Sequence, residues 1–178
     1  QLSTGAAFAD VNGDGHADLL VNGIVAGTRL FMNDGRGRFA ESDDTGLKRD
    51  NSAMSLALAD VDDDGDLDLY VANYIDVMHI ADASTRFTLG RRGGQWVVSR
   101  VNGQSTYKAR FKGRFLATPD GRVKELPEPD CFYLNDGNGK FQQMVFEEGS
   151  FTDEDGRPFA AAHDWGLAVA FRDVNGDL

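Results

Sequence analysis

Residues 60–68 read DVDDDGDLD, and residues 10–18 read DVNGDGHAD. Each stretch follows a short run of small apolar residues and leads directly into a second apolar run, LYV or LLV. A third copy, DVNGDL, occupies residues 173–178. We name these stretches loop one (residues 10–18), loop two (residues 60–68) and loop three (residues 173–178). A repeat of this kind is typical of folds that stack one small unit several times, so it is the feature that decides the fold class.

A second motif follows loop one and loop two in the same order. Residues 30–39 read LFMNDGRGRF, and residues 132–141 read FYLNDGNGKF. Asn-Asp-Gly tolerates positive φ and favours a tight hairpin turn. We name residues 33–35 turn one and residues 135–137 turn two. The first repeat is expected to hold four short strands, which we place at residues 5–9, 18–21, 29–32 and 38–40.

Four strands per repeat predict an all-β fold, a fragment of a β-propeller built from four-stranded antiparallel blades. Loops one and two begin 50 residues apart, slightly more than the 40 to 45 residues typical of a well-known blade. Small residues in the first strand of each repeat suit the innermost strand, where blades crowd around the channel. We expect blade one at about 4–45, blade two at about 52–146 and the start of blade three at 164–178.

Blade two is expected to carry an insertion. Asp10 and Asn33 are 23 residues apart, whereas their counterparts Asp60 and Asn135 are 75 residues apart. The additional 52 residues predict a β-rich insertion at 76–130, between the second and third strands. Within it, residues 95–101 and 106–117 predict a hairpin that turns at Asn102-Gly103.

The charge is distributed very unevenly. Residues 86–124, which we name the basic segment, hold ten of the 18 basic residues and one of the 29 acidic residues. This segment has a net charge of +9, and the remainder of the chain has −20. An acidic body argues against a nucleic-acid partner and favours divalent cations. The basic segment is expected either to fold back on the acidic body or to face an anionic partner.

Two features bear on location. No stretch approaches the roughly 20 apolar residues that a membrane-spanning helix needs. The sequence opens on Gln1 without a signal-peptide pattern and breaks off inside loop three. We therefore expect this sequence to be a piece of a longer protein.

Loops one and two place oxygen-bearing groups at alternate positions, which in a tight loop converge on one centre. Hard oxygen ligands in this number suit Ca²⁺, which takes 6 to 8 oxygens at roughly 2.3 to 2.6 Å. The expected ligands are the side chains of Asp10, Asn12, Asp14 and Asp18 with the backbone carbonyl of His16, and the side chains of Asp60, Asp62, Asp64 and Asp68 with the backbone carbonyl of Asp66. Loop three offers a half-site of Asp173, Asn175 and Asp177, because Leu178 stands where the other loops have glycine.

An EF-hand is the main alternative, because its loop begins in the same way. That loop closes with a bidentate Glu at position 12 and continues into a helix. Position 12 is Val21 in loop one and Val71 in loop two, and both residues lie in apolar runs that favour strands. Each site is therefore expected to close at position nine, with Asp18 or Asp68.

Catalytic motifs are weak in this sequence. Cys131 and His163 are a candidate nucleophile and base, but no stabilising partner is evident for them. The sequence shows no glycine-rich phosphate loop, zinc spacing or serine elbow. We expect a protein that is not an enzyme.

The aspartate loop embedded between two strands resembles the FG-GAP/VCBS repeat of integrin α-subunit propellers. The turn motif and the residues WGLA at 165–168 are similar to the cartilage-acidic-protein and UnbV-like group. The resemblance covers about residues 4–75 and 130–178. It implies that the four side chains of loop one and the four of loop two expected above bind Ca²⁺.

The leading functional hypothesis is a calcium-binding module for protein or matrix interaction or adhesion, located outside the cytoplasm as an extracellular, cell-surface or periplasmic domain. One alternative is a carbohydrate-binding, lectin-like propeller, for which Trp96, Tyr107 and Phe111 are candidate stacking residues. The other alternative is a scaffold domain of a larger secreted enzyme. The partner is then a protein or a glycan.

Overall fold

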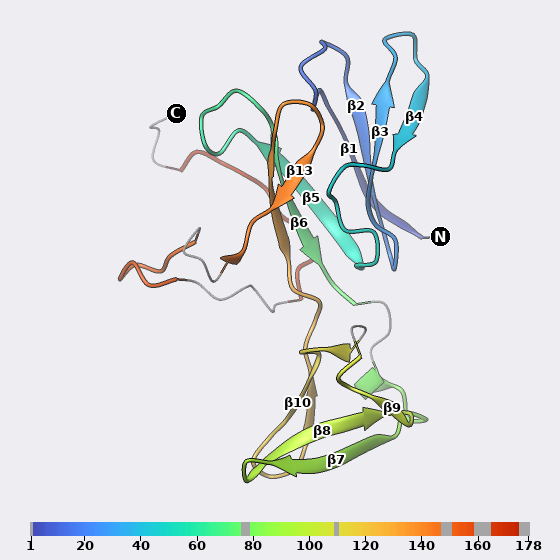
Figure 1. Cartoon of the computed structure of the whole chain (residues 1–178), viewed down its shortest axis with the longest axis vertical. Helices are drawn as coiled ribbons and strands as arrows, with labels where there is room; N and C mark the ends of the chain where they lie inside the picture. The colour runs from blue at the N-terminus through green and yellow to red at the C-terminus, as the bar shows by residue number, and fades with distance from the viewer. Residues whose placement is uncertain (1, 76–78, 109–110, 147–150, 159–164, 175–178) are drawn as a thin grey trace. The chain divides into compact units, whose positions relative to one another are not determined.

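A computed structural model describes residues 2–75, 79–108, 111–146, 151–158 and 165–174. Within these ranges the chain forms thirteen β-strands and one short 3-10 turn (Figure 1). The chain divides into two compact units, which are described separately below. Unit 1 comprises Gln1–Tyr74 and Pro129–Leu178, and unit 2 comprises Ile75–Glu128. Over the described ranges, no helix is long and apolar enough to cross a bilayer.

The first sheet of unit 1 is an antiparallel meander of four strands. They are β1 (Ser3–Ala9), β2 (Asp18–Gly23), β3 (Gly27–Asn33) and β4 (Phe39–Ser42), and their order in the sheet is β1-β2-β3-β4. Loop one joins β1 to β2, and turn one joins β3 to β4. Apolar β2 lies between β1 and β3, where Leu20 is fully buried.

The second sheet of unit 1 repeats this arrangement with strands that are distant in sequence. Its members are β5 (Ala53–Ala59), β6 (Asp68–Asn73), β12 (Cys131–Asn135) and β13 (Phe141–Gln143), in the order β13-β12-β6-β5. Strands β6 and β12 are separated in sequence by unit 2 but pair directly, with Val71 opposite Cys131 and Leu69 opposite Tyr133. The predicted all-β fold with four-stranded antiparallel sheets is therefore confirmed, and it is consistent with a β-propeller fragment.

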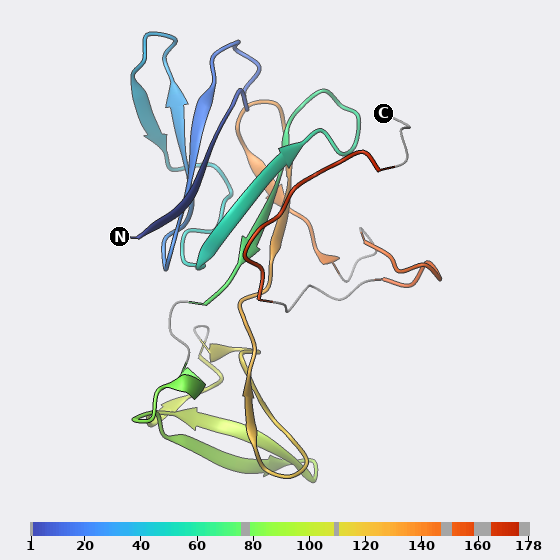
Figure 2. The same ribbon diagram turned by 180° about the vertical axis from the view of Figure 1, so that it is seen from behind.

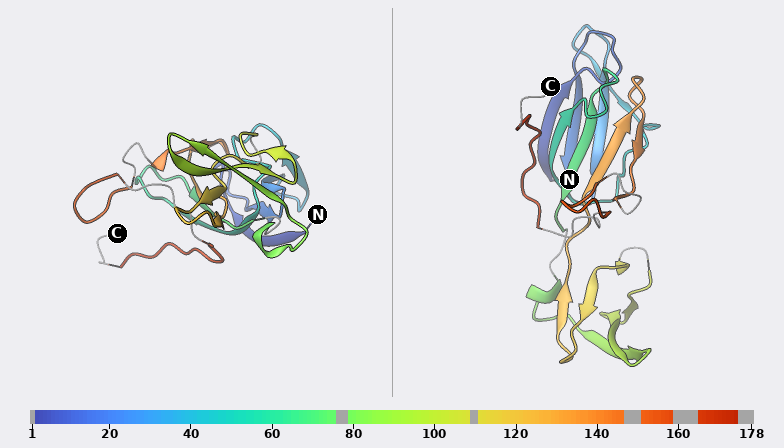
Figure 3. Two further views of the ribbon diagram at one scale, coloured as in Figure 1. Left: turned by 90° about the horizontal axis from the view of Figure 1, so that it is seen from below. Right: turned by 90° about the vertical axis from the view of Figure 1, so that its left-hand side faces the viewer.

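The core of unit 1 lies between its two sheets. Strands β1 and β2 contact β5, so the first strands of the two sheets are neighbours (Figure 3). A Cβ added to Gly5 would lie 3.3 Å from the carbonyl oxygen of Met54, which shows how closely these strands approach. The buried cluster draws on both sheets and on their connector: Val11, Leu20, Leu30, Leu47, Ala53, Leu69, Val71, Cys131, Tyr133 and Phe141. Each buried Leu or Val side chain contributes about 1.5 to 3 kcal/mol, so the two sheets stabilise each other.

The connector between the sheets, residues 43–52, is bound to both of them. The backbone N–H of Thr28 donates to the carbonyl of Lys48 (3.1 Å), and the N–H of Phe141 donates to the carbonyl of Thr45 (2.8 Å). Leu47 inserts into the core between these two contacts. The connector therefore acts as a further layer that ties β3 to β13.

Unit 2 contains two small sheets and the 3-10 turn His79–Ala81. Strands β7 (Phe87–Arg92), β8 (Gln95–Val101) and β9 (Gln104–Ser105) form one sheet, and β10 (Phe115–Ala117) and β11 (Val123–Glu125) form the other. Val98, Val101, Phe111 and Phe115 make its core. The buried carboxylate of Glu125 contacts Nδ1 of His79 at 3.2 Å and Nε of Arg114 at 3.3 Å.

The hairpin expected inside the insertion forms only in part. The turn at Asn102-Gly103 is present with φ of 48° and 78°, but the strand that follows it is only two residues long. The main partner of β8 is β7, and of the described residues between 106 and 117 only Phe115–Ala117 form a strand, which pairs with β11. The expectation failed because Phe111 and Phe115 are core residues, and packing them interrupts the extended chain. Phe111 is 4% exposed, so its proposed stacking role is wrong.

The expected first strand of blade three is not a strand in the described residues 165–174. This extended segment passes beside β5, where the N–H of Val169 donates to Oγ of Ser55 (3.3 Å; Figure 2). A strand requires a hydrogen-bonded neighbour, and in both complete sheets the first strand pairs with the strand after the aspartate loop. The corresponding partner of residues 165–174 is not among the described residues.

Candidate metal centre

The two aspartate loops and the two Asn-Asp-Gly turns lie at the same end of the sheets of unit 1 (Figure 1). This placement follows from the antiparallel order of the strands. The β1–β2 and β3–β4 connections lie at the same end of the first sheet, and the β5–β6 and β12–β13 connections lie at the same end of the second. Two motifs that are separate in sequence are therefore adjacent in each sheet.

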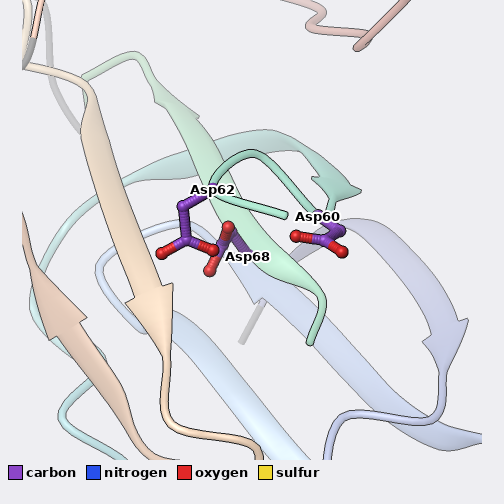
Figure 4. Close-up of side chains that lie close together, drawn as sticks. All are labelled: Asp60, Asp62 and Asp68. Carbon is purple, nitrogen blue, oxygen red and sulfur yellow. The ribbon is translucent and has the colours of Figure 1, made fainter. Parts of the chain in front are cut away.

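Loop two brings three carboxylates together. One oxygen each from Asp60, Asp62 and Asp68 lie within 4.8 Å of one another (Figure 4). Two oxygens on opposite sides of one Ca²⁺, each at 2.3 to 2.6 Å, are about 5 Å apart. The spacing of these three side chains therefore fits a shared calcium ion.

In both loops the carboxylate of the first aspartate accepts the same two backbone N–H groups. In loop two, Asp60 accepts the N–H of Asp64 at Oδ1 (3.2 Å) and that of Gly65 at Oδ2 (2.9 Å). In loop one, Asp10 accepts the N–H of Asp14 and that of Gly15 at 3.2 and 2.8 Å. The two loops also share a backbone conformation at position four, where Asp63 has φ 61° and its counterpart Gly13 has φ 70°. The two loops are therefore structural repeats of each other.

The closing aspartates are fully buried carboxylates. Asp68 accepts the N–H of Val61 at Oδ2 (3.1 Å) and the N–H of Asn135 at Oδ1 (2.9 Å). Asp18 accepts the equivalent N–H groups of Val11 (3.3 Å) and Asn33 (2.8 Å). Each closing aspartate thus joins its loop to the end of the third strand. A buried carboxylate needs such partners, since burial without them is costly.

The electrostatics of the loops favour a cation, most of all in loop two. Loop two contains six aspartates and loop one contains three. Partial desolvation and the charges of Asp64 and Asp68 raise the pKa of Asp62. In loop one, by contrast, hydrogen bonds from Asn12 and from the N–H of His16 lower the pKa of Asp14. A divalent cation relieves carboxylate repulsion of the kind found in loop two, so the donor set fits Ca²⁺.

The aspartate at position five of each loop, Asp14 or Asp64, accepts a hydrogen bond from within its own loop. Oδ1 of Asp64 accepts the N–H of Asp66 (2.9 Å), and Oδ1 of Asp14 accepts the N–H of His16 (2.8 Å). Asp64 lies outside the carboxylate cluster in this conformation. Its role as a ligand remains a prediction, as does that of Asp14.

The side chains of His16 and Asp66, expected to contribute only their carbonyls, contact the turns. A Cβ added to Gly35 would lie 2.4 Å from Nε2 of His16, and one added to Gly137 would lie 2.3 Å from Oδ2 of Asp66. Glycine at this point of each turn therefore leaves room for the side chain at position seven of the neighbouring loop, His16 or Asp66. In loop three, Asp173 is described and exposed, whereas Asn175 and Asp177 lie outside the described residues.

The sequence interpretation did not identify two residues that contact the aspartate loops, Asn33 and Asn135. Besides the backbone bonds to the closing aspartates, their side-chain amides bind loop carbonyls: Nδ2 of Asn33 donates to Ala17 (2.9 Å), and Nδ2 of Asn135 donates to Leu67 (3.2 Å). The available signal was the recurrence of Asn at the same place in both turns. The preference of Asn for tight turns was enough to explain that recurrence. The contact between each Asn and its aspartate loop was therefore not expected.

Cys131 has the surroundings of a structural thiol. Its side chain is buried, and the side-chain amides of Asn51 and Asn73 donate to its sulfur at 3.4 and 3.5 Å. Burial raises the pKa of this thiol, whereas a nucleophilic cysteine needs a lowered pKa. His163, the other half of the catalytic pair considered above, lies outside the described residues.

A comparison with protein families agrees with the geometry of loops one and two. Residues 10–71 match the family described as FG-GAP-like repeat. This match begins at the first residue of loop one and ends in β6, so it includes both loops. No curated protein matches the chain. Kinship with the narrower cartilage-acidic-protein and UnbV-like group remains a prediction. Residues 10–71 are therefore similar to the FG-GAP-like repeat family.

Proposed function

We propose that unit 1 binds two Ca²⁺ ions, one in loop one and one in loop two, and that the ions rigidify this end of the sheets. The observation that carries the proposal is the convergence of Asp60, Asp62 and Asp68 within 4.8 Å. The matching backbone bonds of Asp10 and Asp60 support the same role for loop one. Bound Ca²⁺ supplies positive charge and up to eight coordination positions for the loop oxygens.

The proposed setting is outside the cytoplasm. Calcium sites of extracellular modules have dissociation constants of about 10⁻⁴ to 10⁻³ M, which match extracellular rather than cytosolic calcium. A rigid, calcium-loaded end of the sheets suits a surface for protein or matrix contacts, as expected from the resemblance to integrin propellers. We assign no catalytic step to the chain.

Calorimetric titration of the wild-type chain is expected to give two bound Ca²⁺ ions. Asp14→Ala and Asp64→Ala should each reduce the stoichiometry to one, because each change removes a carboxylate from a different loop. Calcium at ten times the dissociation constant should stabilise the wild type by about 1.4 kcal/mol per site. Asp153→Ala is the matched control, since Asp153 belongs to a separate acidic turn in which it accepts the N–H of Arg157 (2.9 Å). Absence of calcium binding by the wild type would refute the proposal.

A second function, binding of an anionic glycan, is favoured by a surface cavity in unit 2. The cavity has a volume of about 450 Å³ and is lined by Arg91, Gly94, Gln95, Trp96, Ala117 and Pro119. The guanidinium of Arg91 lies 4.5 Å from the centroid of the Trp96 ring. A stacked arginine keeps its N–H groups directed outward for a carboxylate or sulfate, and an indole face suits the apolar face of a sugar.

Trp96 fluorescence in a Trp165→Phe background should report this binding. A sulfated oligosaccharide is expected to bind, and Arg91→Ala should weaken it about tenfold through loss of a charge-assisted contact. Arg100→Ala is the control, because Arg100 is an exposed arginine that donates to the carbonyl of Gly103 (3.0 Å). Salt at 1 M should weaken binding, since the Debye length falls from about 8 to about 3 Å. If the same oligosaccharide without sulfate bound with equal affinity, the proposal of an anionic ligand would be contradicted.

A further inference from the structure

A hydrogen-bonded chain connects loop one to loop two through Asn135. In loop two, the backbone N–H of Asn135 donates to the closing carboxylate of Asp68 (2.9 Å). Its side-chain Nδ2 donates to the carbonyl of Val11 in loop one (2.9 Å). The N–H of Val11 in turn donates to the closing carboxylate of Asp18 (3.3 Å). One asparagine therefore contacts both loops, although Val11 and Asn135 are 124 residues apart.

The amide of Asn135 uses both of its hydrogens in these contacts. Nδ2 donates to the carbonyl of Leu67 at 3.2 Å in its own sheet and to that of Val11 in the first sheet. A primary amide has two donor hydrogens, so both are engaged. Residue 135 is 7% exposed, which makes the two donors costly to lose. Asn33 occupies the same position in turn one and donates to the carbonyl of Ala17.

The burial of loop one agrees with this connection. Val11 is 1% exposed and belongs to the core between the two sheets, whereas its counterpart Val61 is 44% exposed. Loops one and two share the backbone bonds to their first and closing aspartates, so the difference comes from the second sheet, which covers Val11. Loop one is thus packed against the sheet that carries loop two.

We propose that Asn135 is a positioning residue that couples the two calcium sites, so that filling one site raises the affinity of the other. This inference rests on the proposed calcium function. An ion in loop two orders Asp68 and, with it, the backbone of Asn135. The side chain of Asn135 then holds the carbonyl of Val11, which restrains loop one before its own ion binds. The second ion then binds to a loop that is already ordered, so its binding loses less conformational entropy. This produces positive cooperativity between the two sites.

A thermodynamic cycle on the intact chain tests the coupling. Asp62→Ala disables loop two, and this change should lower the calcium affinity of loop one on the order of fivefold, within the usual range of coupling between sites. In an Asn135→Ala background, the same Asp62→Ala change should leave the affinity of loop one unaltered. In an Asn33→Ala background the fivefold effect should persist, because the described hydrogen bonds of Asn33 lie within the first sheet and its own loops. An Asp62→Ala effect that is absent in the wild type, or that survives Asn135→Ala, would overturn the proposal.

A measurement on metal-free protein separates this inference from the calcium function. Amide hydrogen exchange at Val11, whose N–H donates to Asp18, should be faster in Asn135→Ala than in wild type, since Asn135 no longer holds the adjoining carbonyl of Val11. Val61, the same loop position without the cross-sheet bond, provides the internal reference for changes in global stability. Unchanged exchange at Val11 would refute the bridge even if both ions bind. Faster exchange in a chain that binds no calcium would preserve the bridge and refute only the proposed function.

Discussion

Replacement of Asp68 with alanine is expected to destabilise unit 1 by about 3 to 5 kcal/mol in the absence of calcium. The Asp68 carboxylate is fully buried and accepts the N–H groups of Val61 and Asn135. Alanine leaves both donors without an acceptor, at about 1 to 3 kcal/mol each, and opens a small cavity as well. Urea denaturation in the presence of a chelator measures this free energy of unfolding.

Asp62→Ala is the matched control for this prediction. Asp62 belongs to the same carboxylate cluster but is exposed, and partial desolvation together with neighbouring charges raises its pKa. Its removal should change the metal-free stability by no more than about 0.5 kcal/mol, as for most surface substitutions. It should nevertheless abolish calcium binding in loop two. Equal losses of metal-free stability in both variants would show that the buried bonds of Asp68 do not carry the structural role assigned here.

Replacement of Gly46 with alanine is expected to cost at least about 3 kcal/mol of stability. Gly46 lies in the connector with φ 76°, and an added Cβ would be 2.1 Å from the carbonyl oxygen of Phe141. The obstacle is backbone, which cannot rotate away as a side chain can. The collision would break the bond from the N–H of Phe141 to Thr45 (2.8 Å) and displace Leu47 from the core. Losses of this size follow from disrupted packing and strained backbone together.

Gly37→Ala separates the collision from the backbone strain. Gly37 has φ 79°, almost the value of Gly46, but an added Cβ would meet no atom within 4 Å. The expected cost is about 1 to 2 kcal/mol, from the left-handed conformation alone. The midpoints of urea denaturation of the two variants should therefore differ clearly. Similar midpoints would mean that the connector can move away from β13 without a loss of stability.

Local patterns in the sequence determined the strands, the turns and the candidate metal ligands of unit 1. The spacing of Asp60, Asp62 and Asp68 predicted a loop between two strands because each of these features involves residues fewer than ten positions apart. The Asn-Asp-Gly motifs predicted turns for the same reason, since positive φ is a property of the residues themselves. The equal order of loops and turns extended this prediction to four-stranded sheets.

Tertiary structure alone decided which of these residues are buried and which loops contact each other. Asp18 and Asp68 read in the sequence as two ligands among several, but packing makes them buried acceptors at the ends of β3 and β12. The approach of Gly46 to Phe141 and the bond from Asn135 to Val11 join segments 95 and 124 residues apart. No local pattern specifies such contacts, because they depend on how two separately formed sheets pack together.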